Sequence, residues 1–286
     1  MEFAIYSSLH YEVIGPAHFL FALSCLKSDG QKVIEERFST STKDEVEELS
    51  VGTSHNRFNK VFIETPGDFS VDYRARVEVE PGMVAVNDLA DTEMHGMDGS
   101  ELAFLFPSRY AQTDLLRGAA WDLFGIYEDP HKLALAIEDW LFEHIDYQYG
   151  SSNEQSSALE TFATRSGVCR DFAHLGIAFC RALNLPARYV TVYAHGLEPQ
   201  DFHAVFEVYL GDRWVVMDGT RKVPLNGLVR IATGRDAGDV AMATLFGHVI
   251  GTGIQVTVDE LPGEGVEFCP LFRDVLREEG LLVELR

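Results

Sequence analysis

Cysteine is scarce in this chain. The 286 residues contain four cysteines, at positions 25, 169, 180 and 269. Four cysteines this far apart are too few and too scattered for a disulfide scaffold, which small secreted domains use in place of a large core. Reduced thiols are therefore the expected state, and each cysteine can be assessed by its own surroundings.

Long apolar runs are also missing. The most apolar stretch near the N-terminus, residues 13–26, is interrupted by Pro16 and His18, and Glu2 stands where a signal peptide would carry Lys or Arg. No run reaches the roughly 18 apolar residues of a membrane span. The sequence predicts a soluble, cytoplasmic protein without membrane association.

Positive charge is in short supply. Lys and Arg together number 23 against 45 Asp and Glu, which gives a formal net charge of −22. A field of that sign repels nucleic acid and anionic membranes, so neither is expected as a partner. Solubility is the simplest interpretation of the charge, and a preference for cationic substrates or partners is the more specific one.

The pattern of residues changes along the chain. Short β-rich runs at 61–63, 71–79 and 102–106, separated by Gly, Pro and Asp, predict a small antiparallel sandwich, with a polar loop or short helix at 39–54. After Pro107, helical spacing at 113–125 and 130–145 precedes a third helix and strands near 187–193, 203–210 and 213–218. We expect an α+β protein with a β-rich domain at 1–108 and a second domain with a C-terminal extension at 109–286, packed together without a flexible linker.

Cys169 is the candidate nucleophile. Ser166 is a reasonable N-cap, which places Cys169 in the first turn of the third helix. The unpaired backbone N–H groups and the positive end of the helix dipole favour the thiolate, which attacks carbonyl carbons, and the same N–H groups can hold an oxyanion. Alternatively, Cys169 is a small buried residue, as most free cysteines are.

The other cysteines are interpreted as core residues. Cys180 follows Cys169 by 11 residues, about 16 Å along the helix, which is too far for a disulfide or a shared metal ion. Cys25 and Cys269 have no helix-start context, and the same interpretation applies to them.

His203 and Asp218 lie in a predicted hairpin. Residues 201–210 alternate between an apolar and a more polar face, Gly211-Asp212 offers a tight turn, and 213–218 is the return strand. A symmetric two-residue turn pairs residues whose numbers sum to 423, so His203 and Asp218 become diagonal neighbours on one face, with Cβ atoms about 7–8 Å apart. A bulge would break this register.

Two alternatives remain for the hairpin pair. His203 can be a solvent-facing strand residue, and Asp218 can belong to an Asp-Gly turn. The combination of a helix-start cysteine with a His/Asp pair on one hairpin face favours a triad, in which the carboxylate fixes the imidazole tautomer. His174 lies about 140° around the helix from Cys169 and does not serve the same site, and Cys169, His174 and His203 lack the short-range spacing of a zinc site.

Several strings resemble motifs of the bacterial transglutaminase-like superfamily, in particular a transglutaminase-like cysteine peptidase subgroup with an N-terminal β region. The strings are Arg165 to Leu175 around Cys169, Leu185 to Val190, Asp201 to Ala204 around His203, Asp218 to Thr220, and Pro107 to Tyr110. The order Cys, His, Asp also agrees, and the resemblance covers about residues 100 to 240 well and the N-terminal region weakly.

The resemblance implies a papain-like, transglutaminase-like core with an N-terminal β-sandwich-like domain. It implies a Cys169–His203–Asp218 triad that carries out acyl transfer or amide or peptide hydrolysis through a thioester, on a protein or peptide substrate. Ala204 departs from the Trp that often follows the motif histidine, which affects a substrate subsite and not the triad. No calcium-loop pattern is visible, so neither metal nor cofactor is expected. The alternative is a non-catalytic protein- or peptide-binding module on the same fold.

Overall fold

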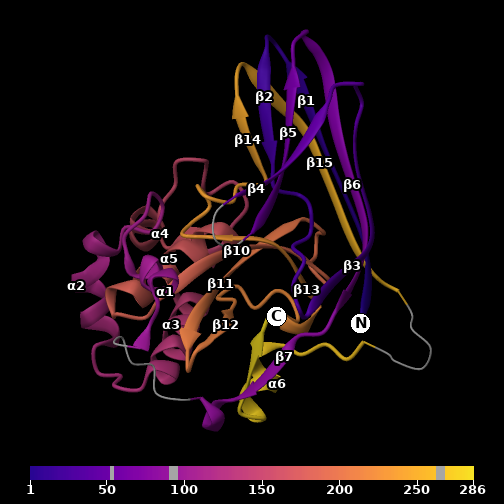
Figure 1. Ribbon diagram of the computed structural model, residues 1–286. Helices are drawn as coiled ribbons and strands as arrows, with labels where there is room; N and C mark the ends of the chain where they lie inside the picture. The colour runs from indigo at the N-terminus through magenta and orange to yellow at the C-terminus, as the bar shows by residue number, and fades with distance from the viewer. Residues whose placement is uncertain (52–54, 90–95, 262–267) are drawn as a thin grey trace.

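The computed structural model describes residues 1–51, 55–89, 96–261 and 268–286. It consists of a tall β-sandwich and, below and beside it, a six-stranded antiparallel sheet flanked by helices (Figure 1). The α+β class predicted from the sequence is confirmed, and so is the N-terminal sheet domain. Within the described ranges, no helix is long and apolar enough to cross a membrane.

Two four-stranded antiparallel sheets form the sandwich. The first has the strand order β15-β1-β6-β3 and the second β14-β2-β5-β4. Buried residues alternate with more exposed ones along strands such as β2 and β6, and the interior holds an aromatic cluster that includes Tyr11, Phe19, Phe21 and Phe69. The strand bounds are β1 Glu2–Val13, β2 Ala17–Phe21, β3 Gln31–Thr40, β4 Val46–Val51, β5 Asn56–Ile63, β6 Gly67–Val79, β14 Ala243–Phe246 and β15 Val249–Leu261.

The second sheet has the order β13-β10-β11-β12-β16-β7. Its strand bounds are β7 Gly82–Ala85, β10 Ala187–Ala194, β11 Phe202–Leu210, β12 Arg213–Met217, β13 Leu228–Gly234 and β16 Leu281–Glu284. The two halves of the molecule exchange strands: β14 and β15, late in the sequence, complete the sandwich, while β7 joins the six-stranded sheet. A single cut at residue 108 therefore does not separate the two sets of sheets.

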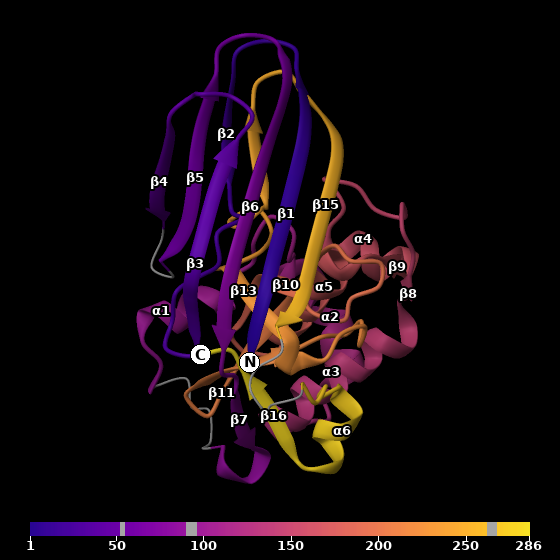
Figure 2. The same ribbon diagram turned by 90° about the vertical axis from the view of Figure 1, so that its right-hand side faces the viewer.

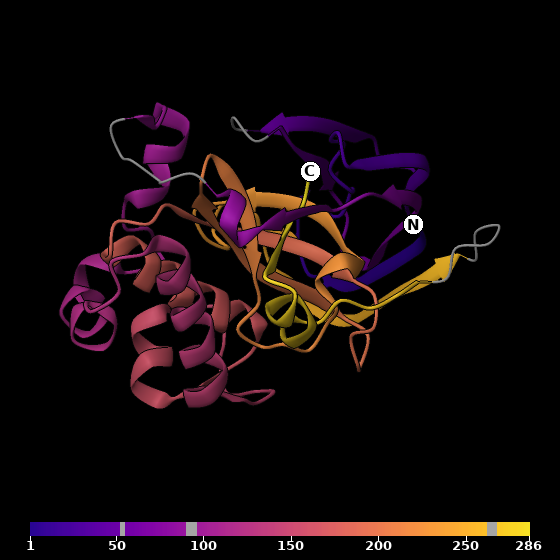
Figure 3. The ribbon, with the colours of Figure 1, turned by 90° about the horizontal axis from the view of Figure 1, so that it is seen from below.

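The helices gather around α5, which packs against β10 and β11 and is contacted by α2, α3 and α4 (Figures 1 and 3). Close contact is possible because Gly176 of α5 lies against the ring of Phe206, where a Cβ would come within 2.6 Å of a ring carbon. The helix bounds are α1 Gly99–Leu102, α2 Thr113–Phe124, α3 Pro130–His144, α4 Ala158–Thr164, α5 Cys169–Ala182 and α6 Arg273–Glu278.

Most predicted elements are confirmed, and two are wrong. The predicted strand at 102–106 is instead the end of α1 and the short 3-10 helix Ala103–Leu105, with Phe106 as its C-cap, because Asp98 and Glu101 cap a helical turn there. Residues 39–51 contain the end of β3 and all of β4 instead of a loop or helix; residues 52–54 lie outside the described part. The acidic residues of β4 face basic partners across β5, as in the Glu47–Lys60 ion pair at 3.0 Å.

Candidate active site

Cys169 is the first residue of α5 and is half-buried. The helix is capped at Val168, whose N–H donates to Asp171 Oδ2 at 2.9 Å, while Ser166 lies in the short strand β9 (Ser166–Gly167). The predicted Ser166 cap is therefore wrong, because a carboxylate in the first turn takes over that role. The predicted place of Cys169 in the first turn is confirmed, next to backbone N–H groups that have no partner within the helix.

A two-residue parallel pairing fixes the chain beside Cys169. Strand β8 (Asp146–Tyr147) pairs with β9, so that Tyr147 lies opposite Gly167. Gly167 is required here because a Cβ would come within 2.7 Å of the Asp171 side chain. Burial raises the pKa of Tyr147 most, and the Cys169 thiol raises it further. The Cys169 backbone N–H opposes that rise. The β8–β9 pairing thus places Tyr147 beside the segment that leads into Cys169.

The predicted hairpin register is confirmed. Strands β11 and β12 pair Tyr209 with Trp214 and Phe206 with Met217, and both pairs sum to 423. Gly211 and Asp212 have positive φ values of 54° and 63°, as a tight two-residue hairpin turn requires. Since this register holds, the side chains of residues 203 and 218 project from the same face of the hairpin.

His203 and Asp218 are in direct contact. Nε2 of His203 lies 3.0 Å from Oδ2 of Asp218, and the two residues are only 1% and 2% exposed. The alternative of a solvent-facing histidine is therefore wrong. Nδ1 of His203 is buried and has no hydrogen-bond partner among the described residues. The imidazole is thus bound to the carboxylate through Nε2, which leaves Nδ1 as the nitrogen available to the neighbouring Cys169 thiol.

The surroundings favour a charged pair. Burial lowers the pKa of His203, but the Asp218 carboxylate and the nearby Cys169 thiol more than offset this and raise it from 6.5 to about 10. Burial raises the pKa of Asp218, yet His203 and the hydroxyl and backbone N–H of Thr220 together lower it below 3.8. An imidazolium beside a carboxylate is the favoured state at neutral pH.

Asp218 is held by partners that the sequence reasoning missed. Its Oδ1 accepts from the backbone N–H of Thr220 at 2.9 Å and from the Thr220 hydroxyl at 2.7 Å. Its own N–H donates to Oε1 of Glu138 in α3 at 2.7 Å. Two features of the sequence could have identified Thr220 as a partner of Asp218. It belongs to the Asp218 to Thr220 string, and the predicted register places it opposite His203.

Glu138 forms a buried ion pair with Arg273 of α6, at 2.6 Å between Oε2 and Nε. Burial raises the pKa of Glu138 and the arginine opposes that rise. Arg273 also donates to the backbone carbonyl of Val216 at 2.7 Å, so α6 is tied to the strand that leads to Asp218. Glu138 lies on the buried face of α3, and neither Glu138 nor Arg273 was predicted from the sequence.

The other cysteines differ from Cys169. Cys180 is fully buried, which confirms its assignment to the core, and burial raises the pKa of its thiol. Cys25 is also buried, and burial raises the pKa of its thiol to about 12. Cys269 is exposed, so its assignment to the core was wrong. It lies before α6, where the backbone runs along the surface and its carbonyl accepts from Asn226.

His174 is not part of the Cys169 constellation. It is buried between the rings of Tyr110 and Tyr189, with both ring centroids at 5.1 Å, and Nε2 accepts from the backbone N–H of Ala237. Burial holds the pKa of His174 well below 6.5. Among the described residues, no group of three His, Cys, Asp or Glu side chains could hold a metal ion.

Lys222 lies at the edge of the site. Its Nζ is 4.4 Å from the centre of the Tyr147 ring, and its side chain is exposed. Taken together, a half-buried thiol at a helix start, an imidazole bound to a buried carboxylate and a neighbouring phenol offer a nucleophile, a proton donor and hydrogen-bond donors for an oxyanion.

Comparisons with known proteins identify the family and the fold. Residues 121–219 match the family model of the transglutaminase-like superfamily, and residues 1–100 match that of the bacterial transglutaminase N-terminal domain. The crystal structure of a provisionally named cysteine protease from Cytophaga hutchinsonii is similar, with a TM-score of 0.94 and 41% identity over 100% of this chain and 98% of that chain.

Two curated mycobacterial relatives are more distant. An uncharacterised protein of Mycobacterium leprae is 27% identical over 186 residues, which are 61% of this chain and 66% of that protein. One from Mycobacterium tuberculosis is 28% identical over 142 residues, 44% of this chain and 45% of that protein. The matched part therefore spans between 45% and 66% of the length of these relatives.

Proposed function

Because the chain belongs to the transglutaminase-like superfamily, with a papain-like core, we propose that it is a cysteine-dependent enzyme that transfers or hydrolyses acyl groups through a thioester. Cys169 is the nucleophile, His203 the acid and base, and Asp218 the residue that orients the imidazole. The observation that carries this proposal is the 3.0 Å contact between His203 and Asp218, buried next to a half-buried thiol at a helix start.

Acylation uses the charged form of the pair. The Cys169 sulfur, as thiolate, attacks the carbonyl carbon of an amide, and the carbonyl oxygen becomes an oxyanion. The C–N bond then breaks, and the His203 imidazolium gives its proton to the leaving amine nitrogen. A His203 pKa raised to about 10 keeps that proton available at neutral pH. The products of this half-reaction are a free amine and a Cys169 thioester.

Deacylation reverses the roles. Neutral His203 removes a proton from water or from an acceptor amine, which attacks the thioester carbon and releases the Cys169 sulfur. Water gives hydrolysis, and an amine gives transamidation. Asp218 stabilises the imidazolium that forms again and fixes which nitrogen faces the sulfur.

The oxyanion needs donors beside Cys169. The backbone N–H of Cys169 lies at the helix start, and Tyr147 stands on the strand that pairs with the two residues before Val168. We assign these two groups to the oxyanion site, where each donor stabilises the developing negative charge. Both belong to segments that the β8–β9 pairing holds together.

The substrate class follows from the site and the charge. A nucleophile of this kind acts on a protein or peptide amide, and the net charge of −22 favours substrates with basic residues. Action in the cytoplasm, without nucleic acid or membrane as partner, stays a prediction.

An amide peptide library incubated with the full chain, with and without a primary amine, tests the function. Turnover in wild type that is absent in Cys169→Ala is expected, and mass spectrometry of the products separates hydrolysis from transamidation. Binding of library members without any turnover in wild type would contradict the enzyme and favour a binding module on the same fold.

A further inference from the structure

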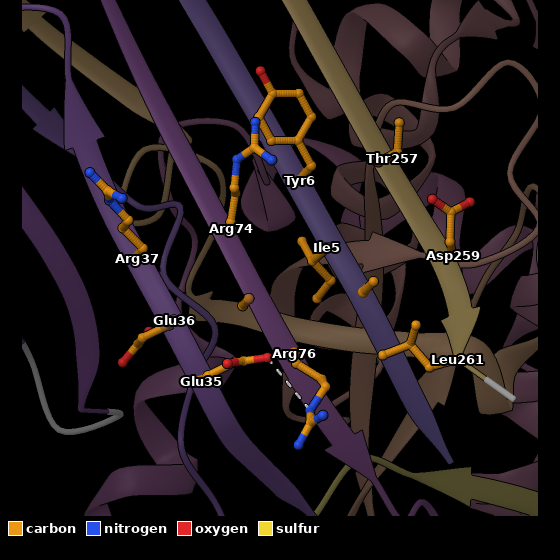
Figure 4. Close-up of a pocket in the computed structure, with 12 residues that line it drawn as sticks. Ile5, Tyr6, Glu35, Glu36, Arg37, Arg74, Arg76, Thr257, Asp259 and Leu261 are labelled. Carbon is orange, nitrogen blue, oxygen red and sulfur yellow. Dashed lines mark ion pairs between the residues drawn. The ribbon is translucent and has the colours of Figure 1, made fainter. Parts of the chain in front are cut away.

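A shallow groove of about 500 Å³ lies on the outer face of the sandwich sheet β15-β1-β6-β3. Figure 2 shows this face turned toward the viewer, with no helix in front of it. Figure 4 shows the groove at closer range, with side chains from all four strands around it. The groove is separate from the Cys169 site, and its assignment does not rest on the proposed function.

One cross-strand row supplies the basic part of the groove. The register places one residue of each strand side by side, in the order Arg37, Arg74, Tyr6 and Thr257. The guanidinium of Arg74 lies 4.5 Å from the centre of the Tyr6 ring, and the Tyr6 hydroxyl donates to Asp72 at 2.8 Å. Stacking on an anchored ring holds the Arg74 fork in place before any ligand arrives.

Arg37 and Arg74 are directly opposite each other, and both are exposed. Like charges facing each other across strands destabilise a sheet. In the described residues, no carboxylate lies within ion-pair distance of either guanidinium, although the chain has 45 acidic residues against 23 basic ones. Arg76, by contrast, pairs with Glu2 at 3.6 Å and Glu35 at 3.8 Å. The row therefore holds two adjacent arginines without an ion-pair partner among the described residues.

The neighbouring row explains the shape and sets a limit on the ligand. It consists of Glu35, Arg76, Ala4 and Asp259. Ala4 is small and lies between the longer Arg76 and Asp259, and both Ala4 and Tyr6 line the groove. Glu35 and Asp259 place negative charge at this end of the groove, so a long acidic segment lying along it would be repelled there.

We propose that this groove binds a small phosphate monoester, with the phosphate between Arg37 and Arg74 and the organic part over Ala4 beside Tyr6. Guanidinium forks match phosphate oxygens in bidentate geometry, and two adjacent forks suit a doubly charged group. The volume is that of a small-molecule site. Thr257, at the end of the basic row, adds a hydroxyl donor.

Calorimetric titration of the full chain with phenyl phosphate at low salt tests the site, with Arg74→Gln and the double variant Arg37→Gln/Arg74→Gln as the changes. Arg74→Gln should weaken binding about tenfold and the double variant further, because each removes a charge-assisted hydrogen-bond donor. Lys32→Gln, an equal charge change on β3 outside the groove, is the matched control and should alter affinity less than about twofold. The melting temperature without ligand should hold or rise in the arginine variants, because a repulsive pair is relieved.

Three results would overturn the proposal. The first is no heat of binding at about 10 mM phenyl phosphate, a concentration that fills even a millimolar site. The second is an equal loss in Lys32→Gln and Arg74→Gln, which would mean that only overall charge matters. The third is tighter binding of a hexaglutamate peptide than of phenyl phosphate, which would assign the face to an acidic protein segment.

Discussion

The two ends of the Cys169–His203–Asp218 constellation are built differently. At the aspartate end, Asp218 is 2% exposed, and its carboxylate and its backbone N–H all have partners in His203, Thr220 and Glu138. At the cysteine end, the thiol is half-buried, Tyr147 stands on a two-residue strand, and Lys222, which lies over the Tyr147 ring, is exposed.

Because of this difference, changes at the two ends should affect the stability of the fold and the reactivity of the thiol to different extents. A buried carboxylate is tolerable only when its hydrogen bonds and a counter-charge are in place, so a change at the aspartate end disturbs the fold as well as the chemistry. A half-buried thiol loses little packing when it is replaced, so a change at the cysteine end should alter activity alone. The two ends can therefore be told apart by measuring turnover and unfolding in the same variants.

Cys169→Ala should have the largest effect on activity. Acyl transfer should be abolished, because no thioester can form, while the melting temperature stays close to that of wild type. Cys169→Ser is the conservative companion and should be equally inactive. Turnover on an amide peptide and thermal unfolding measure the two effects, and residual wild-type turnover in either variant would remove Cys169 from the mechanism.

Asp218→Asn should lower turnover by about 10² to 10⁴-fold. The asparagine Oδ1 can still accept from Thr220, but its amide then faces Nε2 of His203 and forces the imidazole into the wrong tautomer. Because the site is buried, the variant should also unfold at a lower temperature. Wild-type turnover with Asn at 218 would leave a Cys169/His203 dyad and make Asp218 a turn residue.

Local patterns predicted the hairpin and the helix start well, because both depend on neighbours in sequence. A two-residue turn fixes every pair of the β11–β12 ladder. The polar residues before the third helix placed Cys169 in its first turn, although the cap itself is Val168 and not Ser166. Long-range partners were not predictable in this way. Arg273 meets Glu138 across 135 residues, and no local pattern shows that β15 returns to β1. The strand β4 was not predicted because its residues are polar and acidic. Their charges have partners only on the neighbouring strand β5, which the local sequence of β4 does not show.

Tyr147→Phe tests the cysteine end without touching the thiol. Loss of an oxyanion donor should reduce kcat about 10²-fold, with KM and the melting temperature nearly unchanged, because the ring still packs between its neighbours. Tyr127→Phe, on an exposed loop between α2 and α3, is the matched control and should retain full activity. A fall in stability without a fall in kcat would make Tyr147 a packing residue only.

The charged pair also predicts how stability varies with pH. The folded-state pKa of His203 is raised from 6.5 to about 10, so its contribution is complete below 6.5 and is lost as the pH rises toward 10. The pKa of Asp218 is lowered, so its contribution is present above 3.8 and is lost as the pH falls. Urea unfolding across this range should show the difference in stability between wild type and His203→Gln narrowing from pH 6.5 to about 10. A constant difference over that window would contradict a protonated His203.

Cys180→Ala should have the smallest effect on activity and gives the internal control for Cys169. Both cysteines lie on α5, 11 residues apart, which is about 16 Å along the helix. Cys180 is fully buried and burial raises the pKa of its thiol, so it remains an unreactive core side chain. Removing its sulfur should cost on the order of 1 kcal/mol of unfolding free energy, through lost packing in the core. Turnover and the rate of alkylation at Cys169 should be unchanged. An inactive Cys180→Ala variant that unfolds at the wild-type temperature would contradict this prediction. It would show that the reactivity of Cys169 depends on Cys180, so that α5 could not be divided into a reactive start and an inert, buried remainder.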